Sequence, residues 1–427
     1  MTVPDALARP DAPLPDVVQR FLRYVQIDTQ SDPGSSSVPT TEKQKDLARV
    51  LLAELREVGI DAEMDGAGYV YGRVPATQPG LPKLGLVAHV DTSPDAPGGP
   101  VRPILHPDYD GSVLALPGDP SVTLDPARQP ALLDHLGHTL ITSDGTTLLG
   151  SDDKAGCAAI LAAVALMLRS DAPRPELRIL FTVDEEVGRG TDHLDLDRFS
   201  ADVAYTVDGT TVGQIDDETF CAAEATVRFA GRVVHPGYAT GVMVNAARAA
   251  AAFVAALPPD EQPETTSGRE GYVYPHTLQA DTGAATVRVL LRDFDGDGLD
   301  RREALVRDVA AEVSERFGAE ATVEVRQQYR NLREYVEGQE PRAVPFALEA
   351  AREVGLEPVR HAIRGGTDGA RLSALGIPTP NVFTGGHDFH SRFEWNTVEN
   401  LQATVRFLTA LVGRWGRAGA DSPAPAS

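Results

Sequence analysis

The N-terminal half of the chain alternates short apolar runs with longer apolar or amphipathic segments. Residues 84–90 and 177–183 are apolar runs of strand length, and residues 202–207 form a third such run. Residues 154–168 are apolar almost throughout and long enough for a buried helix. Because strands and helices take turns here, we predict an α/β fold in which helices cover both faces of a sheet.

A further helix is predicted around residues 47–58, where leucine and valine recur at helical spacing. Thr40 and Thr41 precede this apolar stripe, and Gly59 follows it. Threonine is favoured at helix N-termini and glycine just after their C-termini, so we expect the helix to be capped at these residues.

The pattern changes after about residue 216. Alternating strands (225–230, 285–291 and 321–325) and two helical segments (245–257 and 301–317) predict a compact α+β unit of ordinary domain size. Helices and strands then alternate again up to a helix at 398–415. We therefore expect a smaller domain inserted into a larger α/β domain, with these bounds: first part of the catalytic domain 1–216, inserted domain 217–335, second part 336–417 and a disordered tail 418–427.

Composition narrows the classes of function. The 427 residues carry a formal net charge of -23, which would repel a phosphate backbone, so we expect no nucleic-acid partner. The two cysteines, Cys157 and Cys221, are too few for a disulfide framework and suit a reducing compartment. The longest apolar run is too short to span a bilayer, and the N-terminus resembles no signal peptide. We expect a cytoplasmic protein without a membrane partner.

Acidic and histidine residues follow the predicted strands in a regular way. In an open α/β sheet, ligands bind beyond the carboxyl ends of the strands. Burying several carboxylates there is costly unless a cation neutralises them. Zinc accepts His and carboxylate ligands, and two metal ions can share one carboxylate. The candidate clusters are His89-Val90-Asp91, Asp152-Asp153-Lys154, Asp184-Glu185-Glu186, Asp208-Gly209 and, near the C-terminus, His390.

These residue types suggest roles without fixing all of them. Asp91 lies two residues after His89 on the same face of an extended segment, so it can orient the imidazole. One glutamate of the pair Glu185 and Glu186 can bind metal while the other stays free as a general base. The residues alone do not decide which glutamate does which. Either Asp152 or its neighbour could likewise bridge two ions.

Several motifs together carry a resemblance that covers residues 17 to 410. The segments that carry it are VQIDTQS (25–31), AHVDTSPD (88–95), DGTTLLGSDDKAG (144–156), FTVDEEVGRG (181–190), YTVDG (205–209), VHPGYATGVMVNA (234–246), RDFD (292–295), NLRE (331–334), IRGGTDGARLS (363–373) and NVFTGGHDFHS (381–391). With these segments the chain resembles the two-zinc metallopeptidase family that also includes aminoacylases, dipeptidases and related carboxypeptidases, and within it the peptidase T branch of tripeptide aminopeptidases.

The resemblance implies two Zn²⁺ ions per subunit. His89 and Asp208 would hold one ion, Glu186 and His390 the other, and Asp152 would bridge both. It also implies a mixed sheet in the catalytic domain. The inserted domain would be ferredoxin-like and would act as a lid that also mediates homodimerisation.

The resemblance further implies hydrolysis of small peptides, mainly tripeptides, with release of the N-terminal residue. A zinc-bridging water would attack the peptide bond, with Glu185 as general base and Asp91 orienting His89. His235 would stabilise the oxyanion. Three further residues would bind substrate carbonyl and carboxylate groups: Asn245, Arg292 and Arg364.

Some neighbouring residues are left outside this predicted metal site. We expect His387 to lie near His390 without binding metal, and Asp95, Asp153 and Asp184 to stay outside the ligand set. The segment 293–304 imitates a calcium loop but has Ala304 where a bidentate glutamate is required. It is better interpreted as a strand end, a turn and the start of a helix.

Two alternatives differ in kind from a tripeptidase. One is another hydrolase of the same family, such as a dipeptidase or an aminoacylase. The other is a metal-binding or peptide-binding protein without catalysis. The second is disfavoured because a binding module would need neither Asp91 nor Glu185 in addition to its metal ligands.

Overall fold

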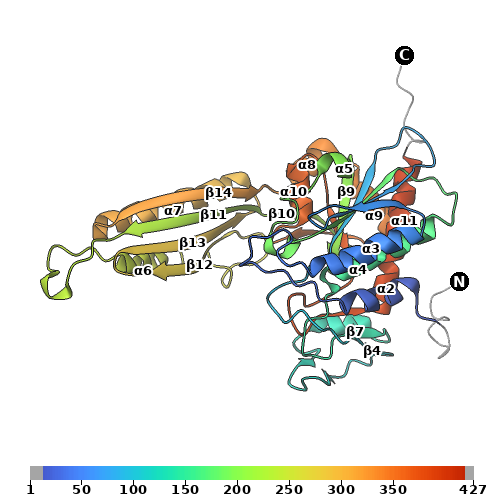
Figure 1. Cartoon of the computed structure of the whole chain (residues 1–427), viewed down its shortest axis with the longest axis horizontal. Helices are drawn as coiled ribbons and strands as arrows, with labels where there is room; N and C mark the ends of the chain where they lie inside the picture. The colour runs from blue at the N-terminus through green and yellow to red at the C-terminus, as the bar shows by residue number, and fades with distance from the viewer. Residues whose placement is uncertain (1–12, 419–427) are drawn as a thin grey trace, which may run out of the picture. The chain divides into compact units, whose positions relative to one another are not determined.

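The computed structural model describes residues 13–418, and these form two compact units (Figure 1). Unit 1 contains the chain up to Asp217, residues 338–361 and the chain from Thr367 onward; unit 2 contains residues 218–337 and 362–366. Apart from Ala418, the tail predicted at 418–427 lies outside the described residues. No helix within 13–418 is long and apolar enough to cross a membrane.

Unit 1 is built on a mixed eight-stranded sheet with the strand order β1-β2-β8-β3-β9-β16-β10-β15. The central strands β8, β3, β9 and β16 run parallel, whereas β1, β2 and β10 pair antiparallel with their neighbours. This confirms the predicted α/β class and mixed sheet. The strands are β1 (Asp61–Met64), β2 (Val70–Val74), β3 (Leu84–His89), β8 (Leu177–Thr182), β9 (Val203–Gly209), β10 (Gln214–Thr219), β15 (Val359–Ile363) and β16 (Asn381–Phe383).

Helix α4 (Ser151–Met167) lies at the centre of unit 1. It packs against β3 and β9 and against two helices, α2 (Asp16–Val25) and α11 (Val398–Arg417), which explains why nearly all of its residues are buried. The remaining helices are α3 (Gln44–Glu57), α5 (Leu196–Phe199), α8 (Leu332–Gln339, across the unit boundary), α9 (Ala343–Glu353) and α10 (Asp368–Ala374).

The predicted caps of α3 are wrong at its N-terminus. The helix begins at Gln44, and its N-cap residue is Lys43 without a side-chain cap. The Thr40 hydroxyl instead donates to the carboxylate of Asp184 at 2.5 Å, so a tertiary contact uses the group that was expected to cap the helix.

A small antiparallel sheet in unit 1 contains β4 (Ile104–His106), β7 (Leu140–Thr142) and β17 (Trp395–Thr397). Trp395 is fully buried here in a cluster with Tyr109, Leu124, Leu132 and Leu140. Since β17 begins five residues after His390, this cluster anchors the segment that carries the predicted C-terminal ligand. A two-stranded sheet of β5 (Leu114–Ala115) and β6 (Thr123–Leu124) lies in the same part of the chain.

Unit 2 has the connectivity βαββαβ and an antiparallel sheet of order β12-β13-β11-β14. The elements are β11 (Cys221–Ala230), α6 (Ala246–Ala256), β12 (Tyr272–Ala280), β13 (Ala284–Asp293), α7 (Gly296–Phe317) and β14 (Glu320–Tyr329). Both helices cover one face of the sheet and share an apolar core with it (Figure 1). This is the ferredoxin-like pattern.

The calcium-like segment folds as predicted from its sequence. Asp293 ends β13, and Asp295 is the N-cap of α7, where its Oδ1 accepts a 2.6 Å hydrogen bond from the N–H of Gly298. The segment is thus a strand end, a turn and a helix start.

Candidate metal centre

The sheet of unit 1 brings the predicted strand-end clusters to one edge. β3 ends at His89, β9 carries Asp208 at its end, and the segment with Glu185 and Glu186 follows β8. Because β8, β3 and β9 are parallel neighbours, their carboxyl ends lie side by side. Asp152 reaches the same edge from the start of α4.

Asp152 lies between the two histidines. Its Oδ1 is 2.9 Å from Nε2 of His89, and its Oδ2 is 3.1 Å from Nε2 of His390. The two oxygens of one carboxylate therefore face two different imidazoles, which is the arrangement that a ligand shared by two metal ions requires.

Each histidine also faces a second carboxylate. Nε2 of His89 is 3.7 Å from Oδ1 of Asp208, and Nε2 of His390 is 2.8 Å from Oε2 of Glu186. The structure thus brings together all five residues that were predicted as ligands, in two groups that meet at Asp152.

Asp153, which was expected to stay outside the ligand set, also approaches these donors. Ligand atoms of His89, Asp153 and Asp208 lie within 4.8 Å of one another. However, the carboxylate of Asp153 already accepts backbone N–H groups from His89 at 3.2 Å and from Gly156 at 3.1 Å. These bonds give Asp153 a structural function that Asp152 lacks.

The donor set fits divalent cations. Burial, together with the charge of Asp152, raises the pKa of Glu186 to about 8 and that of Asp208 to about 7. Burial alone would lower the pKa of His390, but its bonds to Asp152 and Glu186 raise it to about 11. Oε1 of Glu186 is buried and has no hydrogen-bond partner within the described chain. A cation can displace such protons and use such an oxygen as a ligand.

Asp91 is fully buried and supports both sides of the cluster. Its two carboxylate oxygens accept the backbone N–H groups of Glu185 at 3.0 Å and Glu186 at 3.2 Å. Nδ1 of His89 lies 3.0 Å from the Asp91 carbonyl oxygen and 3.4 Å from its carboxylate. The shorter distance makes the carbonyl the main acceptor of the ring N–H, while the carboxylate fixes the segment that carries the two glutamates.

Glu185 differs from Glu186 in what its side chain contacts. Its carboxylate forms no hydrogen bond or ion pair with the residues described, whereas Glu186 contacts His390. Burial raises the pKa of Glu185 well above its ordinary value, although the nearby His89 opposes the shift. A carboxylate of this kind, close to ligands but not bound to them, has the properties of a general base.

Asp184, the first acid of the Asp184-Glu185-Glu186 cluster, has a structural role. Asp184 has a positive φ of 60° and directs its carboxylate to other partners. It accepts hydrogen bonds from Thr40 and from Nε2 of Gln44, the latter at 2.6 Å.

His235, the predicted oxyanion-stabilising residue, and Asn245, a predicted substrate-binding residue, belong to unit 2. His235 is exposed, and its Nδ1 accepts the N–H of Gly237 at 3.1 Å. Asn245 is the N-cap of α6 and accepts the N–H of Arg248 at 3.1 Å.

The two predicted substrate-binding arginines also lie in unit 2 and hold backbone carbonyls there. Arg292 donates to the carbonyl oxygens of Ala223 at 3.1 Å and Leu291 at 2.9 Å. Arg364 donates to the carbonyl oxygens of Gly268 at 3.1 Å and Glu270 at 2.8 Å. Neither arginine pairs with an acidic side chain in the described part of unit 2.

Two further acids support the cluster: Asp95, which was expected to stay outside the ligand set, and Glu394, which the sequence did not single out. Oδ2 of Asp95 is 3.4 Å from Nδ1 of His390, and the buried Glu394 holds the backbone before Asp152. Each acid lies within five residues of a predicted site residue, and that proximity was the available signal. His387 stacks on Trp395 with ring centroids 4.2 Å apart, so it packs in the small apolar cluster.

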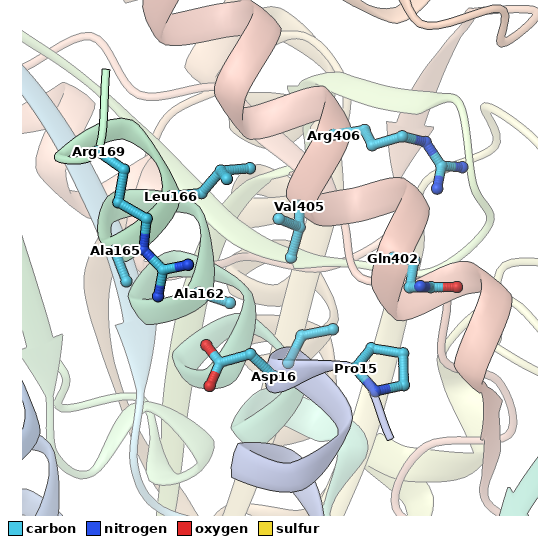
Figure 2. A pocket seen from close by; sticks show the side chains of 10 residues that line it. Pro15, Asp16, Ala162, Ala165, Leu166, Arg169, Gln402, Val405 and Arg406 are labelled. Atoms are coloured by element: carbon cyan, nitrogen blue, oxygen red, sulfur yellow. The ribbon is translucent and has the colours of Figure 1, made fainter. Parts of the chain in front are cut away.

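A cavity of about 340 Å³ lies elsewhere in unit 1, between α2, α4 and α11 (Figure 2). Its walls are largely alanine, valine and leucine side chains, with Arg169 and Arg406 among the polar residues. Its only acid, Asp16, forms an ion pair with Arg20. This cavity therefore lacks the donors for metal chemistry, which are concentrated at the sheet edge.

The chain matches known proteins over most of its length. The model of peptidase family M20/M25/M40 matches residues 144–414. A protein named peptidase T from Geobacillus sp. (strain WCH70) is 42% identical over 401 residues, covering 93% of this chain and 98% of the relative.

The chain belongs to peptidase family M20/M25/M40.

This membership confirms the resemblance seen in the motifs and the prediction of a peptide hydrolase. Two solved structures share the fold of this M20/M25/M40 member. An aminopeptidase PepT from Bacillus cereus has a TM-score of 0.72 at 24% identity, and a tripeptidase from Staphylococcus aureus has a TM-score of 0.73 at 22% identity. In both comparisons, 94% of this chain and 98% of the other chain are covered.

Proposed function

We propose that this M20/M25/M40 member is a two-zinc aminopeptidase that releases the N-terminal residue from tripeptides. The observation that carries the proposal is Asp152, whose two oxygens face His89 at 2.9 Å and His390 at 3.1 Å. The names of the relatives, peptidase T, aminopeptidase and tripeptidase, support the choice of substrate.

In this proposal, His89 and Asp208 would hold one zinc ion, Glu186 and His390 would hold the other, and Asp152 would be shared by both. When bound, the two ions would polarise the peptide carbonyl and lower the pKa of the attacking water. The preference for zinc rests on the mixture of imidazole and carboxylate donors.

The protein's own residues would move the proton. Glu185 takes a proton from the attacking water on its free carboxylate and passes it to the amine that leaves. Burial raises the pKa of Glu185 in the metal-free protein, and two bound cations would lower it again, so that the carboxylate can accept the proton and release it in the next step. Asp91 keeps Glu185 in place through the 3.0 Å bond to its backbone N–H.

The contributions of unit 2 rest on the resemblance alone. His235 would stabilise the oxyanion, while Asn245, Arg292 and Arg364 would bind the substrate's carbonyl and carboxylate groups. A homodimer through unit 2 has the same basis. The local partners of Asn245 and both arginines would have to be exchanged or shared for substrate to bind.

A product assay tests the function. Protein stripped of metal and reloaded with Zn²⁺ is given Leu-Gly-Gly, Leu-Gly, Leu-Gly-Gly-Gly and N-acetyl-leucine, and the products are identified by mass. We expect free leucine and Gly-Gly from the tripeptide, only with metal present. Preferred cleavage of Leu-Gly or N-acetyl-leucine would instead indicate a dipeptidase or an aminoacylase. No cleavage of any substrate would favour a non-catalytic binding protein.

A further inference from the structure

Glu394 is a buried carboxylate that is bonded entirely to the backbone leading into Asp152. It is 1% exposed, and its Oε2 accepts the N–H groups of Leu149 and Gly150, each at 2.7 Å. Its Oε1 accepts the N–H of Asp152 itself at 3.0 Å. One side chain therefore fixes three peptide groups in the four residues that end at Asp152.

No basic side chain in residues 13–418 forms an ion pair with Glu394. The buried Lys154 directs its Nζ to the carbonyl oxygen of Ile27 at 2.7 Å instead. Lys154 interacts with Glu394 through its charge but forms no direct bond to it. A buried carboxylate that lacks a direct basic partner costs stability, and three N–H donors offset only part of that cost. Stabilisation of the fold therefore does not explain why Glu394 is buried at this position.

The segment that Glu394 holds lacks the usual support of a helix. Gly150 has a left-handed conformation with φ of 80°, and Asp152 has non-helical angles of φ -82° and ψ 103°. The regular part of α4 begins only after Asp153. Because helix hydrogen bonds do not fix the backbone of Asp152, its direction depends on Glu394.

The same residue connects the segment to the second histidine. Glu394 lies four residues after His390 and immediately before Trp395, which is fully buried and pairs with Thr142 in the small sheet. Through Glu394, this rigid strand start is bonded to the segment before Asp152. The histidine and the carboxylate that face each other at 3.1 Å thus belong to two segments joined by one side chain.

We infer that Glu394 is a positioning residue, which sets the distance and direction between Asp152 and His390 so that one carboxylate can serve two metal ions. The inference rests on the proposed two-zinc function and adds a residue that acts through Asp152. Carboxylates that hold metal ligands in place typically change metal affinity by about 10- to 100-fold when they are lost.

Glu394→Gln is a selective probe, because the two oxygens have different partners. If the amide oxygen takes the place of Oε2, the bonds from Leu149 and Gly150 remain. The amide nitrogen then faces the N–H of Asp152 and cannot accept it. Glu394→Asp is the complementary variant, since it keeps the charge but is one methylene too short to reach all three N–H groups.

Glu399→Gln is the matched control. Glu399 is partly buried in the same part of the chain, and its Oε2 accepts the N–H of Thr139 at 3.0 Å. Like Glu394 it is a carboxylate that accepts a backbone N–H, although Nδ1 of His138 also lies 3.8 Å from its Oε2, and the segment that it holds carries no predicted ligand.

The measurement is the affinity of the metal-free full chain for Zn²⁺, in competition with a chromophoric chelator, together with the melting temperature of each metal-free variant. We expect Glu394→Gln and Glu394→Asp to weaken zinc binding by about 10- to 100-fold. The metal-free melting temperature of Glu394→Gln should be no lower than that of the unmodified protein, and Glu399→Gln should bind zinc normally.

Two outcomes would overturn the inference. If both Glu394 variants bind Zn²⁺ as tightly as the unmodified chain, or lose only thermal stability, Glu394 is structural. If Glu394→Asp binds normally while Glu394→Gln does not, the charge matters and positioning does not. Failure of the unmodified chain to bind Zn²⁺ would instead contradict the proposed function, so the two failures are distinguishable.

Discussion

Two groups of buried acids in this protein are neutralised in different ways. Along β10, Asp216, Asp217 and Glu218 are consecutive and each is 2% exposed. Each has a basic partner: Asp216 lies 2.8 Å from Nδ1 of His361, Asp217 accepts Nε of Arg360 at 2.6 Å, and Glu218 accepts Nη2 of Arg269 at 2.7 Å. This group of acids is neutralised by the protein's own side chains.

At the carboxyl edge of the sheet in unit 1, the acids outnumber their basic partners. Six acids gather there: Asp91, Asp152, Asp153, Glu185, Glu186 and Asp208. Within residues 13–418, the basic side chains that form ion pairs with them are His89 and His390. In the β10 group, bonds from Arg269 and Asn331 outweigh burial and lower the pKa of Glu218. At the sheet edge, burial raises the pKa of Glu186 to about 8. A shortage of protein cations thus marks the group that is suited to bind metal.

The largest expected effect comes from Asp152→Ala. Removing the shared carboxylate withdraws a ligand from both ions, so we expect tripeptidase activity to fall by more than about 10⁴-fold and bound zinc to be lost. Activity and metal content by mass spectrometry measure this. Asp217→Asn, in the β10 group, is the control and should retain both zinc ions. A metal-replete, active Asp152→Ala protein would remove Asp152 from the bridge.

Glu185→Gln should separate catalysis from metal binding. The variant cannot take up the proton, so kcat should fall by about 10²- to 10⁴-fold while both ions stay bound. The measurements are steady-state kinetics on Leu-Gly-Gly and metal analysis of the same sample. Retained turnover would contradict the general-base role, whereas loss of metal would show that Glu185 is itself a ligand.

The acids and the histidine of the metal centre should also make the stability of the metal-free protein depend on pH. Glu186, Asp208 and Glu394 have raised pKa values of about 8, 7 and 7, so the metal-free folded state binds more protons than the unfolded chain. Its stability should therefore fall as pH rises from 6.5 to 8.5, by up to about 1.4 kcal/mol per pH unit for each titrating group. The raised pKa of His390 acts with the same sign, because stability from its proton is lost as pH rises.

Zinc should reverse this pH dependence, because it takes the place of the protons. Melting curves at several pH values, with and without Zn²⁺, check this prediction. The increase in melting temperature caused by Zn²⁺ should be several degrees larger at pH 8.5 than at pH 6.5. An increase that is independent of pH would contradict proton displacement.

The smallest effect is expected in the β10 group. Arg269→Met should destabilise unit 2 by about 1 kcal/mol, because the arginine is 60% exposed and Glu218 keeps Arg333 at 2.7 Å. Chemical denaturation with and without Zn²⁺ measures this. Added zinc should not rescue the loss, and rescue would show that the two groups of acids are not independent.

The sequence predicted the framework of the site well where the signal was periodic. The apolar runs at 84–90 and 177–183 are β3 and β8, and their ends place His89 and the Glu185 segment correctly. The sheets that depend on pairing between distant segments, such as β7 with β17, could not be predicted from local patterns. The predicted N-cap of α3 was wrong for the same reason, because the hydroxyl of Thr40 donates to Asp184, an acid far away in the sequence.

Individual roles were harder to predict than the cluster. Nothing in the sequence distinguishes Asp152 from Asp153. The structure separates them, because the oxygens of Asp152 face His89 and His390 whereas the carboxylate of Asp153 accepts backbone N–H groups. Glu394 was missed because its three partners lie more than 240 residues earlier in the chain. A helix cap and a substrate contact also use the same residue type, as Asn245 illustrates.

The most direct test of the central claim is a zinc titration of the metal-free full chain, followed by leucine release from Leu-Gly-Gly at each addition. We expect two equivalents of Zn²⁺ to bind per chain and activity to reach its plateau only as the second ion binds. Full activity with a single equivalent, or with no bound metal, would contradict a site built around a carboxylate shared by two ions.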